Sequence, residues 1–124
     1  MTIGETINNV SSVRKGNRYS EKEIISWLSE LDGIIKSETI DTHVGSENVV
    51  FNGYTSETDP DTKLLAADPY GDIYIYYALA KIDFFSNDMT RYNNDMVLFN
   101  DAKRRFTDWY NRTHASNGIS NLRW

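Results

Sequence analysis

The sequence contains no cysteine among its 124 residues. Disulfide frameworks, thiolate zinc sites and cysteine nucleophiles are therefore excluded. Histidine is almost as scarce, because only His43 and His114 are present. The seven glycines are scattered and form no phosphate-binding loop. We expect neither a cofactor nor a metal site from this composition.

Long apolar runs are also missing. No run approaches the roughly 20 residues that a helix needs to span a bilayer. The first fifteen residues, MTIGETINNVSSVRK, lack the basic start and the apolar core of a signal peptide. We expect a protein that stays in the cytoplasm where it is made and does not enter a membrane.

The chain lacks a basic excess. Thirteen Lys and Arg face eighteen Asp and Glu, a net charge of −5, which argues against a free-standing nucleic-acid binder. Residues 41–72 hold seven acids and one lysine, whereas residues 100–124 hold five basic residues and two acids. Such opposed patches suit head-to-tail contact between copies or contact with a charged partner. The alternative is a solvated acidic loop with cations near a helix C-terminus, where the helix dipole favours them.

What is present predicts one mainly α-helical domain over residues 1–114, followed by an extended tail at 115–124. Thr2 and Glu5 fit a capping box that opens a helix at about 3–14. A second box begins at Ser20 and opens a helix at about 21–38. The apolar stripe of this second helix consists of Ile24, Trp27, Leu28, Leu31, Ile34 and Ile35.

Residues 41–67 interrupt the helical pattern. They are acidic, contain Gly45, Gly53 and Pro60, and include one β-type patch at 49–51. A connection this long in a small domain is usually functional or disordered. We expect a projecting loop outside the core, with a short β-hairpin around 48–54.

Two further helices complete the predicted fold. Asp68 as N-cap and Pro69 at the first position predict a helix start, and residues 73–85 are apolar on almost every face. Asn87 or Asp88 caps a last helix that extends to about His114. Its apolar seam is Met89, Tyr92, Met96, Phe99, Ala102, Phe106 and Trp109. The two helices are expected to pack as an antiparallel hairpin.

Candidate interface residues come from two places. Tyr70, Tyr74, Tyr76 and Tyr77 cannot all face one core from a single helix, so some of these rings are expected to meet a protein partner, unless the helix has an unusually wide core face. The tail ends in Arg123 and Trp124, whose composition is that of an interface anchor.

Three other groups of residues were considered as a metal site, a nucleic-acid site and a catalytic site. Glu57, Asp59 and Asp61 lack the ligand spacing of a calcium loop and are interpreted as solvated acids. The basic residues at 103–105 have acidic partners at helical spacing, which disfavours nucleic-acid contact. Asp41 and His43 have no recognisable nucleophile near them. No constellation here supports an enzyme.

The ordered pattern of the chain resembles the small head–tail connector proteins of long-tailed bacteriophages and prophages. The stretches that carry this resemblance are YS at 19–20, WLSELDG at 27–33, DPY at 68–70, IYIYYALAKID at 73–83, RYNN at 91–94, FN at 99–100 and WYNRTH at 109–114. Together with the N-terminal helix they cover about residues 2–114.

This resemblance implies a mainly helical virion protein of the phage neck, made in the host bacterial cytoplasm. It implies a ring, normally of twelve copies, that binds beneath the portal protein and extends the DNA channel. Such a ring completes the head and offers a docking surface to a tail-completion or tail-terminator protein. Genomic DNA passes through it without sequence-specific binding, which suits an acidic subunit.

Two alternatives remain open from the residues themselves. One is a small helical adaptor or regulatory domain that binds a single protein through the tyrosine-rich helix. The other is an enzyme that uses Asp41 and His43.

Overall fold

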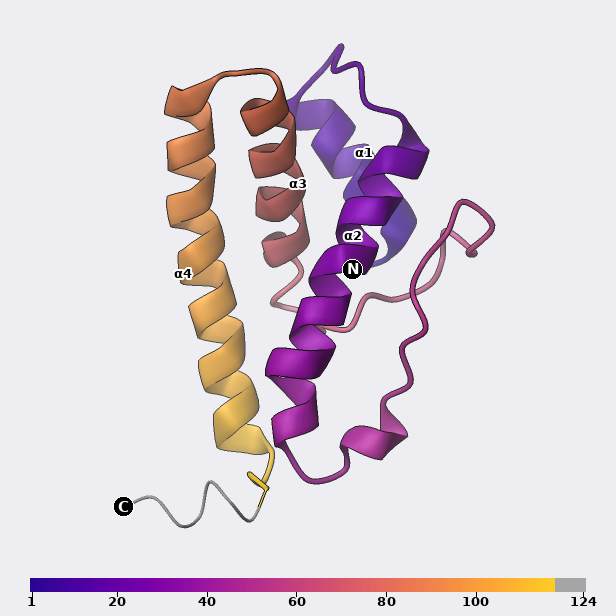
Figure 1. Cartoon of the computed structure of the whole chain (residues 1–124), viewed down its shortest axis with the longest axis vertical. Helices are drawn as coiled ribbons and strands as arrows, with labels where there is room; N and C mark the ends of the chain where they lie inside the picture. Colours follow the sequence, from indigo (N-terminus) through magenta and orange to yellow (C-terminus); the bar gives the residue numbers. More distant parts are fainter. Residues whose placement is uncertain (118–124) are drawn as a thin grey trace.

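Four α-helices make up most of the computed structural model, which describes residues 1–117 (Figure 1). They are α1 (Ile3–Val13), α2 (Glu21–Glu38), α3 (Asp72–Phe85) and α4 (Met89–Thr113). Two short 3-10 turns, at Ile40–Thr42 and Ser46–Asn48, follow α2. The prediction of a mainly helical protein is confirmed. No helix among these residues is long and apolar enough to cross a membrane.

Side-chain caps explain where three of the helices begin. Thr2 Oγ1 accepts a hydrogen bond from Glu5 N at 3.1 Å, and Glu5 Oε1 accepts one from Thr2 N at 3.2 Å. Ser20 Oγ accepts from Glu23 N at 3.2 Å at the start of α2. The Asp88 carboxylate accepts from Arg91 N at 3.1 Å at the start of α4. These contacts satisfy backbone donors that a helix N-terminus leaves free.

The predicted start of the third helix at Asp68 and Pro69 is wrong. Tyr70 N donates to Ala67 O at 2.9 Å in a turn, and α3 begins only at Asp72. The Asp68 carboxylate accepts from the Met1 amino group at 3.1 Å and caps no helix. Gly71 lies against Met1 so closely that a Cβ would be 2.8 Å from Met1 Cβ. This approach of the N-terminal segment holds residues 68–71 in a turn.

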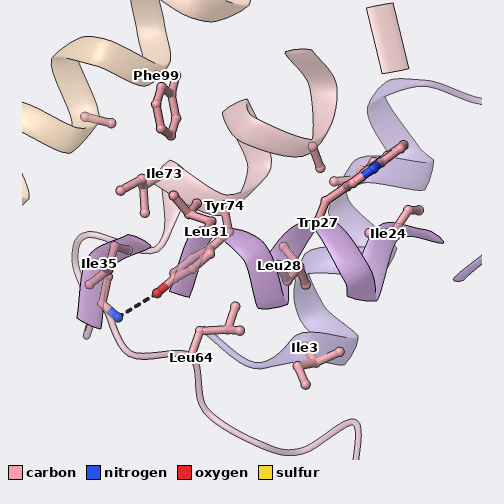
Figure 2. Close-up of a cluster of buried hydrophobic side chains, with 14 of the residues drawn as sticks. Ile3, Ile24, Trp27, Leu28, Leu31, Ile35, Leu64, Ile73, Tyr74 and Phe99 are labelled. Carbon is pink, nitrogen blue, oxygen red and sulfur yellow. Dashed lines mark hydrogen bonds between the residues drawn. The ribbon is translucent and has the colours of Figure 1, made fainter. Parts of the chain in front are cut away.

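Helix α3 lies between α2 and α4, runs antiparallel to α4, and also contacts α1 (Figure 1). This central position explains why its sequence is apolar on nearly every face. Figure 2 shows Leu28 and Leu31 of α2 beside Tyr74 of α3, with Phe99 of α4 on the other side of Ile73.

The apolar seam predicted for α4 is buried in its middle but not at its two ends. Phe99, Ala102 and Phe106 are buried, but Met89 is 43% exposed and Tyr110, rather than Trp109, is buried. A straight helix has 3.6 residues per turn, so a seam with a strict 3.5-residue spacing drifts around it. Met89 also lies at the tip of the bundle, beyond the core.

The loop at 41–67 differs from its prediction in two ways. Residues 48–54 form no β-hairpin; within residues 1–117 the only β-pairing is two isolated bridges, between Thr2 and Lys63 and between His43 and Ser116. The second half of the loop does not project, since Leu64 and Ala66 are buried in the core. Ile3 N and Gly4 N hold it by donating to Thr62 O and Pro60 O at 3.1 and 2.9 Å.

A buried carboxylate fastens the loop to the helices. Asp32 of α2 is fully buried and accepts hydrogen bonds from the Tyr54 hydroxyl at 2.5 Å, the Tyr74 hydroxyl at 2.6 Å and Leu65 N at 3.1 Å. The Tyr74 hydroxyl in turn accepts from Ala66 N at 2.7 Å, as the dashed line in Figure 2 shows. We call Asp32, Tyr54, Tyr74 and their backbone partners the Asp32 network. It connects α2, the loop and α3.

Candidate protein-binding surfaces

An apolar groove lies on α3 and α4, at the end of the bundle where α2 and α4 are far apart (Figure 1). The two helices come together at the opposite end, where Lys103 Nζ lies 3.5 Å from Glu38 Oε2, and diverge toward the α3–α4 turn (Figure 1). The groove has a volume of about 280 Å³. Its lining residues are Tyr77, Ala80, Lys81, Phe84 and Phe85 of α3 with Tyr92 and Met96 of α4.

Exposed aromatic rings dominate this groove. The ring centroids of Tyr92 and Phe84 lie 5.3 Å apart, those of Phe84 and Phe85 5.4 Å, and those of Phe85 and Trp27 6.3 Å. Phe84 is 48% exposed and Phe85 50% exposed. Apolar surface gathered in one place on a small domain usually marks a site of protein contact.

A polar contact closes the side of the groove next to α2. The Tyr77 hydroxyl donates to Glu30, and Lys81 Nζ lies 3.1 Å from Glu30 Oε1. The hydrogen bond from Tyr77 and the contact with Lys81 lower the pKa of Glu30. Burial and the neighbouring Glu30 carboxylate raise the pKa of Tyr77. These contacts anchor α3 to α2 while leaving the aromatic rings exposed.

A cluster of Arg14, Asp83 and Asp95, which we call the acid cluster, lies where α1 and α3 end and α4 begins, next to the groove. Arg14, the residue after α1, donates to both oxygens of Asp83, with Nε–Oδ1 at 2.9 Å and Nη2–Oδ2 at 2.6 Å. Asp95 Oδ1 lies 3.6 Å from Arg14 Nη2, and its buried Oδ2 has no hydrogen-bond partner. Burial and the neighbouring Asp83 carboxylate raise the pKa of Asp95 to about 7. Burial opposes ionisation of Asp83 too, but the hydrogen bonds that Arg14 donates leave its pKa lowered.

A second recess, of about 540 Å³, runs along α4 beside the turn that precedes α3. We call it the arginine recess. Its lining residues are Pro69, Tyr70, Asp72, Ala102, Arg104, Arg105, Asp108 and Arg112. Arg104 pairs with Asp101 and Asp108 at 2.9 and 3.2 Å, and Arg105 pairs with Asp101 at 3.1 Å. Arg112 has no ion-pair partner within the described part of the chain.

A third pocket, of about 480 Å³, lies where the end of α4 meets the turns after α2, and His43 is one of its lining residues. His43 Nδ1 lies 2.7 Å from the Thr39 carbonyl oxygen, so this nitrogen carries the proton and donates. Asp41 pairs with Lys36, not with His43. The structure therefore does not bring the predicted Asp41 and His43 together. In residues 1–117 no group of three His, Cys, Asp or Glu is arranged to hold a metal ion.

The four candidate tyrosines occupy different environments. Tyr74 is fully buried in the Asp32 network, so the prediction that it could meet a partner is wrong. Tyr70 precedes α3 and lines the arginine recess, with its ring 5.2 Å from that of Trp109. Tyr77 lines the apolar groove, and Tyr76 is half-buried. The other two candidates, Arg123 and Trp124, lie outside the described residues.

The sequence analysis does not predict the exposed residues that form the apolar groove. Phe84 and Phe85 belong to the run at 73–85 that is apolar on almost every face, and they lie in the last turn of α3, where they are about half exposed. The signal available was the pair of phenylalanines directly before the polar turn at 86–88. Comparison with protein-family models, curated proteins and solved structures found no match to this chain.

Proposed function

We propose that this chain is a subunit of a head–tail connector ring in a long-tailed bacteriophage. The proposal begins from the sequence pattern over residues 2–114, and the mainly helical fold is compatible with it. The subunit binds beneath the portal, in a ring of twelve copies, and presents the opposite surface of the ring to a tail-completion or tail-terminator protein. Its place in the cell is first the host cytoplasm and then the neck of the virion.

The apolar groove is the observation that supports the proposal best. Phe84 and Phe85 expose about half of their surface at one end of the bundle, next to Met89, which is 43% exposed. Covering these side chains with a partner removes apolar area from water, at roughly 25 cal/mol per Å². A subunit whose work is to assemble with other proteins has a use for such a groove.

The charge of the chain supports the second part of the proposal. With a net charge of −5, the subunit repels the phosphates of passing DNA. A channel wall that does not bind phosphate lets the genome move through without arrest. The proposed role uses no cofactor, no membrane contact and no catalytic step.

Reconstitution with portal rings from the genome that encodes the chain tests this function. We expect the wild-type protein to add a ring of density beneath the portal in negative-stain images. The double variant Phe84→Asp/Phe85→Asp should abolish the added ring, since it places charges in the groove. Val44→Asp, at a site that is 63% exposed and far from the groove, is the control and should bind normally. Wild-type protein that adds no density to the portal would disprove the proposal.

The adaptor alternative keeps one supporting observation. Tyr77 lines the apolar groove, so a protein bound there would contact the tyrosine-rich helix. An adaptor would form a complex of fixed, low stoichiometry with one soluble protein and would leave portal rings unchanged. The same images therefore distinguish the two functions.

A further inference from the structure

Two opposite edges of the molecule differ in charge. Helix α4 forms one edge, and the loop between α2 and α3 forms the other (Figure 1). Residues 41–61 of that loop contain Asp41, Glu47, Glu57, Asp59 and Asp61 and no Lys or Arg. The α4 edge carries the arginine recess, in which three arginines face two aspartates. The edges are therefore complementary in charge.

The acidic turn at residues 55–61 lies at the outer edge of the loop (Figure 1), and it is held by its own hydrogen bonds and by Gly4 N, which donates to Pro60 O at 2.9 Å. Thr55 N donates to Thr58 Oγ1 at 2.8 Å, Asp61 N to Asp59 Oδ1 at 2.9 Å, and Thr62 N to Asp59 O at 2.9 Å. Glu57 and Asp61 are exposed, and their carboxylates take part in none of these bonds. A turn that is already ordered loses little conformational entropy when it binds.

The arginine recess offers what such a turn requires. Guanidinium groups bind carboxylates with two parallel hydrogen bonds, which gives both strength and orientation. The exposed pairs of Arg104 and Arg105 with Asp101 and Asp108 contribute little to stability and exchange readily. Arg112 adds a cation that no described carboxylate neutralises. Tyr70, Pro69 and Ala102 give the recess an apolar part.

The most exposed large apolar residues follow the same division. Val97 of α4 is 69% exposed, and Val50 of the loop is 74% exposed. Each edge therefore carries apolar surface beside its charges, as protein interfaces usually do.

We propose that the acidic turn of one copy inserts into the arginine recess of a second copy. The contact is heterologous, because each copy uses a different surface on each side. Repetition of such a contact gives a closed ring or an open filament, according to the rotation between copies. The inference deepens the proposed function by naming the surfaces between neighbouring subunits, and it rests on that function only for the closure of the ring.

Sedimentation velocity on paired variants tests this contact. Wild-type protein should self-associate as its concentration rises, and added salt should weaken the association. Arg105→Glu/Arg112→Glu removes the recess, and Glu57→Lys/Asp61→Lys reverses the turn; each variant alone should stay monomeric. An equimolar mixture should associate again, since one contact pairs an unchanged turn with an unchanged recess and the other pairs the reversed charges of the two variants.

Controls separate this contact from general charge effects. Lys15→Glu/Arg18→Glu makes the same change in net charge as the recess variant but lies at the α1–α2 turn, and it should assemble like wild type. Arg105→Gln/Arg112→Gln should also stay monomeric, and circular dichroism should show that each variant keeps its helices.

Several results would overturn the inference. Wild-type protein that is monomeric at every concentration would do so, as would a mixture of the two variants that stays monomeric. Turn variants that assemble normally would show that the contact lies elsewhere, and a recess that binds only a foreign acidic protein would assign it another partner. Portal binding without this contact would leave the connector function intact, whereas self-association without portal binding would disprove that function alone.

Discussion

The fold buries carboxylates in two places, and the two differ in how completely they are hydrogen bonded. Asp32 accepts three hydrogen bonds, from Tyr54, Tyr74 and Leu65 N. In the acid cluster, Asp83 and Asp95 share the single guanidinium of Arg14, and Asp95 Oδ2 has no partner. Buried carboxylates are stable only when donors replace the water they have lost.

The difference matches what each site joins. The Asp32 network connects the middle of α2 and the start of α3 to the long loop, which has no regular structure of its own at 49–71. The acid cluster joins the ends of α1, α3 and α4, beside the apolar groove. We infer that the first site fixes the fold, whereas the second leaves one end of the bundle adjustable to its surroundings.

The largest expected effect comes from removing Asp32. Asp32→Ala leaves the buried Tyr74 hydroxyl, and the half-buried Tyr54 hydroxyl and Leu65 N–H, without this acceptor. Breaking a buried charged network in this way costs about 3–5 kcal/mol in the free energy of unfolding. Urea denaturation followed by circular dichroism measures the change. A loss below about 1 kcal/mol would mean that water satisfies these donors and that the network does not hold the loop.

A smaller loss is expected from Tyr74→Phe. The substitution keeps the ring but removes a hydroxyl that donates to Asp32 Oδ1 and accepts from Ala66 N. Two buried groups then lose a partner, while Asp32 keeps its two other donors, so the cost is about 2 kcal/mol. The same denaturation measurement applies. A loss as large as that of Asp32→Ala would show that the three donors act as one cooperative unit.

The helices could be predicted from the sequence because the patterns that indicate them are local. Capping residues and apolar spacing place α1 and α2 within a residue of their observed bounds, and the stripe from Ile24 to Ile35 is almost entirely buried. These signals depend on residues three or four positions apart. The prediction of where α3 starts was wrong because the start depends on Met1, which lies against Gly71 but is distant from it in sequence.

The buried polar sites could not be predicted in the same way. In the sequence, Asp32 is one acid in an amphipathic helix, and such a residue normally faces solvent. Its partners Tyr54, Leu65 and Tyr74 lie 22, 33 and 42 residues away. The tyrosine-rich pattern was enough to name Tyr70 and Tyr77 as candidates. The arginine recess could not be predicted, because it forms only when the turn at 69–72 lies against α4.

The acid cluster makes the stability of the protein depend on pH. The raised pKa of Asp95, about 7 when folded against 3.8 ordinarily, means that the folded state holds this proton to higher pH than the unfolded state. The contribution of Asp95 to stability is therefore present at low pH and is lost as pH rises toward 7 and above. Asp95→Asn should remove this loss and should stabilise the protein relative to wild type at pH 7 and above.

Melting temperatures at acidic, neutral and alkaline pH measure this effect. The comparison that matters is the difference between the variant and wild type at each pH, since groups outside the acid cluster titrate equally in both. Glu47→Gln, at an exposed site of the loop, is the control and should follow the wild-type curve. A constant difference between Asp95→Asn and wild type at every pH would contradict the raised pKa of Asp95.

The smallest effect is expected from Tyr77→Phe, which repeats the chemistry of Tyr74→Phe on the same helix at a more open place. Both hydroxyls donate to a carboxylate of α2, Tyr74 to Asp32 and Tyr77 to Glu30. Tyr74 is fully buried, whereas the side chain of Glu30 is 49% exposed and keeps Lys81 as a partner at 3.1 Å. Water can replace the lost hydroxyl at Glu30, so the cost should be about 0.5 kcal/mol. The ratio of the two losses, measured by urea denaturation under one set of conditions, isolates burial as the cause. Equal losses would show that the contact with Glu30 stabilises α3 as much as the Asp32 network does, and the contrast between the two regions would then be wrong.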